Sequence, residues 1–351
     1  MTPAVLDYQA TPAVQEAIDR LGRTEDIRFS PSRKKLAFSA FEDGRIVVLD
    51  IAVTPSPSGP RIFLSDYVTF SSKNVEHPHG MAFIDEDTLV VANRTQFVSI
   101  FRIPPAGGVE KEFVTKPLRI IWRNRFRRLD SPGSVDVYPI GQNSYRLLIC
   151  DNYAHVVTSA RLNKKHNFRV SGHKVLLAKS LEIPDGVCVS KDKRWIAVSN
   201  HMPGTVFIYA NESALGPESD PVAILLGMDC PHAIRFVEQD QKIIVADAAT
   251  HFVHVYANAG KGWSGDYQPH RVIRVMDDHT FQLGRYNVEE GGTKGIDVDL
   301  DAGVIAMTCE HQPLTFYALK SFLDQEAYTL NEAIRSSGSL PITGTMASSA
   351  G

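Results

Sequence analysis

HPHGMAFI, at residues 77–84, decides the fold because its layout recurs along the whole chain. A short polar turn leads into a segment in which apolar residues alternate with small or polar ones, and a period of two marks a β-strand. Each copy is followed by a second apolar strand, a turn and a third strand. The copies are TEDIRFSP (24–31), HPHGMAFI (77–84), SPGSVDVY (131–138), IPDGVCVS (183–190), CPHAIRFV (230–237) and GTKGIDVD (292–299).

Alignment of the six copies puts one residue at the opening of each first strand, and we call these the mouth residues. They are Glu25, His79, Gly133, Asp185, His232 and Lys294, with gaps of 54, 54, 52, 47 and 62 residues by subtraction. Such gaps are near the roughly 40–50-residue period of propeller blades with loops of variable length. A closed ring of blades also protects the strand edges. We therefore expect an all-β fold, a six-bladed β-propeller with short terminal helices.

The propeller is expected to form a single domain, residues 1–336, followed by a flexible polar tail, 337–351. Its blades are expected near 25–70, 77–120, 131–180, 182–228, 230–276 and 292–319 plus a terminal strand. Candidate fourth strands in the first five blades are PRIFLSD (60–66), EKEFVTK (110–116), HKVLLAK (173–179), DPVAILLG (220–227) and HRVIRVM (270–276).

The ends of the chain offer two ways to close the sixth blade. Either Thr2–Tyr8 or Ile342–Ala347 could supply its fourth strand. Thr11–Leu21 begins with Thr-Pro and stops before a glycine, which predicts a helix, and Ser321–Ser336 also has helical periodicity.

Composition narrows the range of partners. The formal net charge is −3, so no overall positive field attracts nucleic acid, and no nucleic-acid partner is expected. No apolar run approaches the roughly 20 residues that a spanning helix needs, so no membrane partner is expected. Met1–Ala10 lacks the basic and apolar regions of a secretion signal, and the four cysteines form no CxxC pair. We expect a cytoplasmic location, and the oligomeric state stays open.

Two longer insertions interrupt the repeat. Arg119–Arg128 is basic with interleaved aromatic residues, as at nucleic-acid contacts, but we interpret it as a solvated loop or an edge strand ending the second blade. Ala259–Gly292 joins the fifth and sixth blades and could form a lid over the channel.

Four mouth residues carry side chains of the kind that bind metals. In a ring of six blades, Glu25 lies opposite Asp185, and His79 lies opposite His232. Two imidazoles and two carboxylates suit zinc, iron or manganese better than calcium, so we expect these four residues to hold a divalent metal. The alternative is a polar, water-filled channel without a metal.

The other two mouth residues suggest how such a site would work. Gly133 leaves a gap, which we expect to be an open coordination position. Lys294, if a metal or another cation crowds it, would have a lowered pKa and act as an acid or base. The turns between second and third strands add polar groups to the same face. Those expected to bind substrate are Arg94, Asn152, Tyr153, His155 and Glu310, and those expected to transfer protons beside Lys294 are His201, His251 and His311.

On these residues the chain resembles the paraoxonase and arylesterase family and, more distantly, the gluconolactonase-like propellers. Thr24–Ile27 resembles the first-blade motif of that family, Pro78-His79-Gly80 its second-blade motif with an active-site histidine, and Ile183–Gly186 its fourth-blade motif. The resemblance implies a metal in the channel and hydrolysis of lactones or esters.

The chain also departs from that family's pattern. Gly133 and Asp185 stand where the family has asparagine ligands, and His232 stands where it has an acidic one, so calcium of the family type is not expected. The Pro-His pairs of the second and fifth blades are similar to the peptidylglycine amidating lyase propeller, in which histidines at blade openings hold zinc.

The sequence therefore predicts a metal-dependent enzyme that acts on a small polar molecule at the channel mouth. Hydrolysis of a lactone or ester is the first reaction class, and a lyase or isomerase reaction on the same metal site is an alternative. A second alternative is a non-catalytic propeller that binds a peptide, glycan or protein partner through aromatic residues such as Trp122, Phe126 or Trp263.

Overall fold

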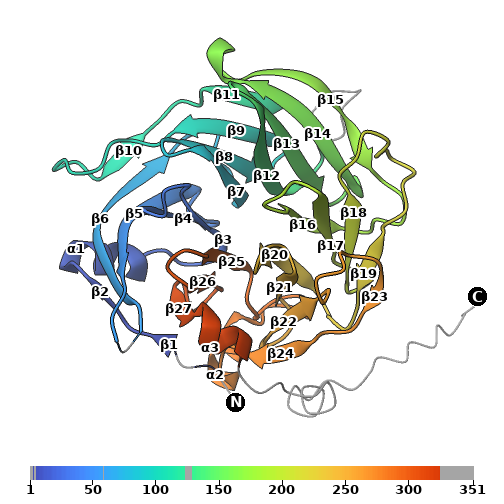
Figure 1. The fold of residues 1–351 in the computed structure, drawn as a ribbon. Helices are drawn as coiled ribbons and strands as arrows, with labels where there is room; N and C mark the ends of the chain where they lie inside the picture. Colours follow the sequence, from blue (N-terminus) through green and yellow to red (C-terminus); the bar gives the residue numbers. More distant parts are fainter. Residues whose placement is uncertain (1–2, 4, 58, 123–128, 325–351) are drawn as a thin grey trace, which may run out of the picture.

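The computed structural model describes residues 3, 5–57, 59–122 and 129–324. In these residues six sheets surround a central axis, and the chain is a six-bladed β-propeller (Figure 1). The innermost strand of each blade begins at or beside a mouth residue. These strands are β3 (Thr24–Phe29), β7 (Pro78–Asp85), β12 (Pro132–Gly141), β16 (Pro184–Val189), β20 (Pro231–Val237) and β25 (Gly295–Asp299).

The other strands follow outward in chain order within each blade. Second strands are β4 (Lys35–Ala40), β8 (Thr88–Asn93), β13 (Ser144–Asp151), β17 (Trp195–Asn200), β21 (Lys242–Asp247) and β26 (Val304–Thr308). Third strands are β5 (Arg45–Thr54), β9 (Phe97–Arg102), β14 (Val156–Asn163), β18 (Thr205–Ala210), β22 (Phe252–Ala257) and β27 (Thr315–Ala318). Fourth strands are β6 (Arg61–Ser71), β11 (Arg119–Trp122), β15 (Arg169–Leu177), β19 (Ala223–Leu225), β24 (Arg271–Arg274) and β1 (Val5–Leu6).

The N-terminal segment closes the ring. Strand β1 pairs antiparallel with β27, with Val5 opposite Tyr317 and Leu6 opposite Phe316. The sixth blade thus combines strands from both ends of the described chain, which ties the first residues to the last blade. The rival segment 342–347 and the expected tail 337–351 lie outside the described residues.

Short strands bridge neighbouring blades, which the sequence did not predict. The segment 110–116 was expected to be the fourth strand of the second blade, and this was wrong. Its strand β10 (Glu112–Val114) runs parallel to β6 in the first blade, while β11 takes the fourth position of the second. Strand β23 (Gly265–Tyr267) likewise joins β19 of the fourth blade, and β2 (Tyr8–Ala10) joins β6. A strand of three residues has too little periodicity to indicate which strand it pairs with.

Helices occupy the rim of the propeller. Helix α1 (Pro12–Asp19) buries Val14 and Ile18 in the core of the first blade. Helix α2 (Asp278–Gly284) lies in the insertion before the sixth blade, the 3₁₀ turn η1 (Lys164–His166) joins β14 to β15, and α3 (Leu319–Asp324) follows β27. Helix α3 starts two residues earlier than predicted, and the remainder of the predicted span lies outside the described residues. None of the described helices has the length and apolar character needed to cross a bilayer.

The aromatic residues proposed as partner contacts have different environments. Trp122 is exposed at the edge of its blade and contacts Phe97. Trp263 is buried, and its Nε1 donates a hydrogen bond to the carbonyl of Asp240, so it is core and not a docking residue. Phe126 lies outside the described residues.

Candidate metal centre

Buried side chains at the ends of second strands fix the loops that carry the mouth residues. Each accepts hydrogen bonds from one or two backbone N–H groups of the loop before the first strand of its own blade, and each is completely buried. These side chains are Asn93, Asp151, Asn200 and Asp247. Since a buried N–H without a partner is unfavourable, each bond selects one loop conformation and sets the starting point of the first strand.

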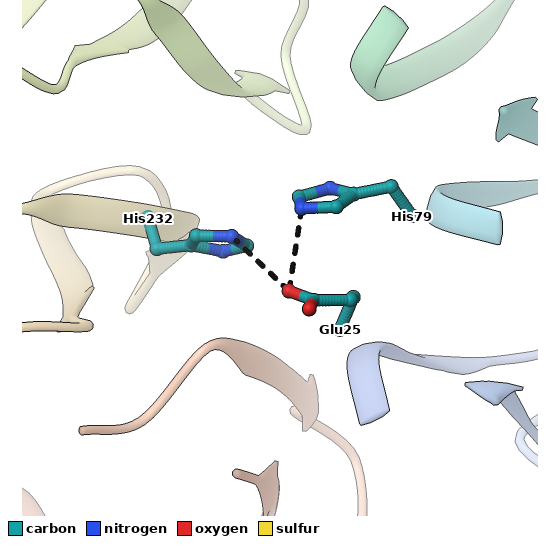
Figure 2. Close-up of side chains that lie close together, drawn as sticks. All are labelled: Glu25, His79 and His232. Carbon is teal, nitrogen blue, oxygen red and sulfur yellow. Dashed lines mark ion pairs between the residues drawn. The ribbon is translucent and has the colours of Figure 1, made fainter. Parts of the chain in front are cut away.

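Glu25, His79 and His232 point toward a common centre from the first, second and fifth blades, as Figure 2 shows. The Nε2 atoms of His79 and His232 lie 3.3 Å and 3.9 Å from Glu25 Oε2, and the three ligand atoms lie within 4.8 Å of one another. All three side chains are buried. We call this group the candidate metal centre.

Backbone carbonyls orient both imidazoles. The Nδ1 atom of His79 lies 2.7 Å from the carbonyl oxygen of Gly133, and that of His232 lies 3.0 Å from the carbonyl oxygen of Lys294. Because a carbonyl oxygen only accepts, each Nδ1 carries the hydrogen, and in a neutral ring each Nε2 then has a free lone pair. Burial lowers the pKa of His232 to about 4 despite the opposing attraction of Asp185, so this ring is neutral at pH 7. Metal-binding histidines are commonly oriented in this way.

The donor set fits a divalent cation. Two Nε2 atoms lie beside Glu25 Oε2, and this buried oxygen has no hydrogen-bond partner among the described residues. Burial alone would raise the pKa of Glu25, but Lys294, His79 and Arg23 together hold it well below its usual range, so the carboxylate is ionised. Converging acceptors repel one another in a buried site unless a cation lies between them. Nitrogen and carboxylate donors suit zinc, iron or manganese.

Asp185, the fourth predicted ligand, lies beside this group. Its Oδ2 is 3.1 Å from His232 Nε2, and its Oδ1 accepts a hydrogen bond of 2.8 Å from Asn152 Nδ2. Burial would raise the pKa of Asp185, but the nearby His232, His79 and Arg94 hold it far below its usual range. An ionised Asp185 therefore adds negative charge next to the candidate metal centre.

The gap expected above Gly133 is filled, so the prediction of an open coordination position there was wrong. A Cβ atom on Gly133 would lie 2.0 Å from Asn152 Oδ1 and 2.4 Å from Asp185 Oδ1. The side chain of Asn152 reaches from the turn after β13 into the space that the third blade leaves empty. Glycine is therefore required at 133 to admit these two side chains.

Lys294 is a fully paired cation. Its Nζ lies 3.0 Å from Glu25 Oε1, 2.7 Å from Glu310 Oε1 and 3.6 Å from Glu290 Oε1. Burial alone would lower the pKa of Lys294, but attraction to Glu25 and Glu310 outweighs it, so the pKa is raised. The pKa of Lys294 was predicted to fall if a metal or another cation crowded it, whereas three carboxylates dominate its surroundings here.

A small polar cavity of about 90 Å³ lies at the candidate metal centre. It has room for about three water molecules at ~30 Å³ each. Besides the three ligands, its lining consists of Arg23, Arg94, Asn152, Tyr153, Ile183, Asp185, His201, Ala248, Glu289, Glu290 and Lys294. Five residues predicted from the turns and mouth to act on substrate or protons are therefore in the lining: Arg94, Asn152, Tyr153, His201 and Lys294.

Other predicted residues lie outside this lining. His155 accepts a hydrogen bond from the backbone of Ile183, and Glu310 is held by Lys294. His251 stacks on Phe281 at 3.9 Å between ring centroids and lies 2.9 Å from Asp278. The last of them, His311, bonds the hydroxyl of Tyr286. These contacts engage all four side chains, and none of the four is in the cavity lining.

Sequence reasoning missed Arg23, Glu289 and Glu290. Arg23 binds Glu25 at 2.6 Å and Glu290 at 2.7 Å, and so connects the first blade to the insertion before the sixth. Residues 259–292, predicted as a lid, thus contribute Glu289 and Glu290 to the cavity lining. Their place in the sequence could have indicated this, since all three charged residues come within a few positions before an aligned opening.

A second buried layer of charge fills the channel beneath the candidate metal centre. Arg28 pairs with Asp26 at 3.0 Å, and Arg235 pairs with Asp297 at 2.6 Å. Asp26 and Asp297 also accept backbone N–H groups of the next blade, from Met81 and Phe29. A space of only about 10 Å³ is left between the two layers. These ion pairs therefore lie on one side of the candidate metal centre, and the cavity lined by the mouth residues lies on the other.

Comparison with known proteins supports the fold and no more. No family model matches the sequence, and no curated protein matches it. Among solved structures, the chain is similar to a functionally unknown protein from Desulfotomaculum acetoxidans, with 10% sequence identity and a TM-score of 0.52. The alignment covers 82% of this chain and 79% of that chain. Identity this low shows a shared fold and carries no function.

Proposed function

We propose that this propeller is a metal-dependent enzyme that acts on a small polar molecule, with hydrolysis of a lactone or ester as its reaction. The observation that carries the proposal is the convergence of two imidazole Nε2 atoms on a buried carboxylate oxygen at a small polar cavity, an oxygen for which the described segments supply no hydrogen-bond donor. Perturbed ionisable groups converging in a cavity are typical of catalytic sites. The resemblance of the openings to those of lactone- and ester-hydrolysing propellers favours this reaction class over a lyase or isomerase.

Each residue has a distinct task in this proposal. A divalent ion held by Glu25, His79 and His232 would supply Lewis-acid polarisation of a carbonyl and lower the pKa of water. Lys294 keeps Glu25 ionised and fixed through its 3.0 Å ion pair. His201 lines the cavity, and its task in the proposal is to exchange a proton with substrate.

Chelation and reconstitution test the proposal. The purified protein would be stripped of metal, reconstituted with Zn²⁺ or Mn²⁺, and assayed against a panel of lactones and aryl esters. We expect hydrolysis to disappear on chelation, to return with metal, and to be lost in His232→Ala. His166→Ala, which changes an exposed histidine in η1, is the matched control and should hydrolyse like the wild type.

Two results would contradict the proposal. If chelation left hydrolysis unchanged, the metal would have no role in the reaction. If the metal-loaded protein hydrolysed nothing on the panel, the proposed hydrolysis would be refuted and the lyase or isomerase alternative would remain.

A further inference from the structure

Arg94 occupies the lone pair that the candidate metal centre needs. It lies in the turn between β8 and β9, and its Nη2 is 3.0 Å from His79 Nε2. A guanidinium group only donates hydrogen bonds, and the Nδ1 of His79 already donates to a carbonyl, so the Nε2 atom is the acceptor. One lone pair cannot serve the guanidinium and a metal ion together. Arg94 is therefore the cation that contacts the His79 imidazole in this structure.

We propose that Arg94 and a divalent cation compete for His79 Nε2, and that the guanidinium released by the cation binds the carboxylate group of a small substrate. This inference rests on the proposed function, and it adds the class of substrate and a coupling between metal and substrate.

The pairing of the cationic side chains singles out Arg94 as the anion-binding group. Arg23 is held by Glu25 and Glu290, and Lys294 is held by its three carboxylates. Arg94 has a carboxylate at 3.8 Å, Asp185, and a hydrogen bond of 3.4 Å to Ser131. Its side chain is 25% exposed, so a ligand from solvent can reach it. A guanidinium without a close counter-ion binds a carboxylate through two parallel hydrogen bonds.

A divalent cation would offset the negative charge around the cavity. Three basic side chains and four carboxylates line the cavity, and these carboxylates are Glu25, Asp185, Glu289 and Glu290. Without counting the imidazoles, these groups sum to −1, or to −2 with Glu310, which pairs with Lys294, and two added positive charges offset this negative charge, so that an anion is no longer repelled. A cavity of about 90 Å³ has room for a carboxylate group. Metal and carboxylate therefore each raise the affinity of the site for the other, since such coupling is reciprocal.

Measurement of Mn²⁺ affinity separates this competition from a structural role. Free Mn²⁺ would be followed by electron paramagnetic resonance at constant ionic strength, in chloride, in acetate and in inorganic phosphate. We expect Arg94→Ala to bind Mn²⁺ about tenfold more tightly than the wild type in chloride, because the competitor is gone, which corresponds to ~1.4 kcal/mol. Acetate should tighten Mn²⁺ binding to the wild type and leave Arg94→Ala unchanged.

Two further variants make the result interpretable. Arg94→Gln keeps a polar side chain with N–H donors and removes the charge, and it should behave like Arg94→Ala. Arg102→Ala removes an exposed arginine at the far end of β9 in the same blade, and it should match the wild type in every salt.

Each outcome is decisive. Weaker or unchanged Mn²⁺ binding in both Arg94 variants would overturn the competition. If phosphate tightened Mn²⁺ binding and acetate did not, the proposal that the substrate carries a carboxylate group would be refuted. Failure of every protein to bind Mn²⁺ or Zn²⁺ would instead refute the metal centre of the proposed function, and is distinguishable because the variants would not differ.

Discussion

A glycine at position 133 allows side chains from two other segments to meet. Asn152 and Asp185 fill the space where a third-blade side chain would project, so the identity of one residue is set by atoms far away in sequence. Gly133→Ala should displace both side chains, lower the free energy of unfolding by about 1–3 kcal/mol and weaken metal binding. Urea denaturation and metal titration would check this.

Gly141→Ala provides the control, because Gly141 ends the same strand and a Cβ there would meet its nearest atom at an ordinary 3.7 Å. It should unfold like the wild type. Equal effects of the two substitutions would show that strand geometry, and not the two side chains, requires glycine.

The buried His232 makes stability depend on pH. Its pKa is about 4 in the folded protein, against about 6.5 in an unfolded chain. As pH falls through this window the unfolded chain takes up the proton first, so the contribution of His232 is complete above pH 6.5 and is lost by pH 4. The loss is roughly 3 kcal/mol. Metal-free wild type should therefore lose more stability than His232→Asn between pH 7 and pH 4 in urea titrations, and parallel curves would refute the assignment.

At this scale the repeat predicted which mouth residues converge, but it did not predict what surrounds them. His79 and His232 occupy equivalent positions in aligned openings, so their convergence follows from the ring. Asn152 and Arg94 lie in turns whose side chains can point inward or outward, and no pattern in the sequence decides which. The ion pairs of Lys294 depend on Glu290 and Glu310, which come from two different segments.

The second strands act as anchors for the loops that carry the mouth residues. Asn200 accepts from the backbone N–H of Glu182 and donates to the carbonyl of Ser180, so it holds the loop before Asp185 at two points. Asn200→Ala should lower the free energy of unfolding by about 1–3 kcal/mol, because it removes both of these hydrogen bonds. Asn200→Asp keeps the acceptor and places there the residue that blades three and five use, Asp151 and Asp247, so it should lose less. Chemical denaturation compares the two.

An equal loss in the two Asn200 variants would contradict the role of this acceptor oxygen. The repeat itself makes such anchors visible in the sequence, since an Asn or Asp ends four of the six second strands. The partners of the bridging strands β10, β2 and β23 could not be predicted, because a parallel pairing of three residues has no periodicity that indicates which strand it joins.

Closure of the whole ring depends on a strand of two residues. Leu6 packs against the core cluster of the first blade, whereas Val5 is 51% exposed on the opposite face. Leu6→Ala should lower the free energy of unfolding by about 1–2 kcal/mol, less than a fully buried leucine would. Val5→Ala removes a similar apolar group from the same strand and should change it by less than about 0.5 kcal/mol. Thermal and urea denaturation would reveal the difference, and equal small effects would mean that β1 does not stabilise the ring.

The ring was the most predictable level of this molecule. Six copies of one layout determine the number of blades, because each copy needs neighbours on both sides to bury its faces. Closure by the first residues was one of two open possibilities, since a pair of apolar residues near either terminus satisfies the same edge.

Anomalous diffraction from crystals soaked in Zn²⁺ or Mn²⁺ tests most directly whether this ring holds a metal. The account predicts an anomalous peak about 2.0–2.2 Å from Glu25 Oε2, His79 Nε2 and His232 Nε2. The same soak of Glu25→Gln crystals should show a much weaker peak or none. A wild-type crystal with no peak at these three atoms would contradict the account.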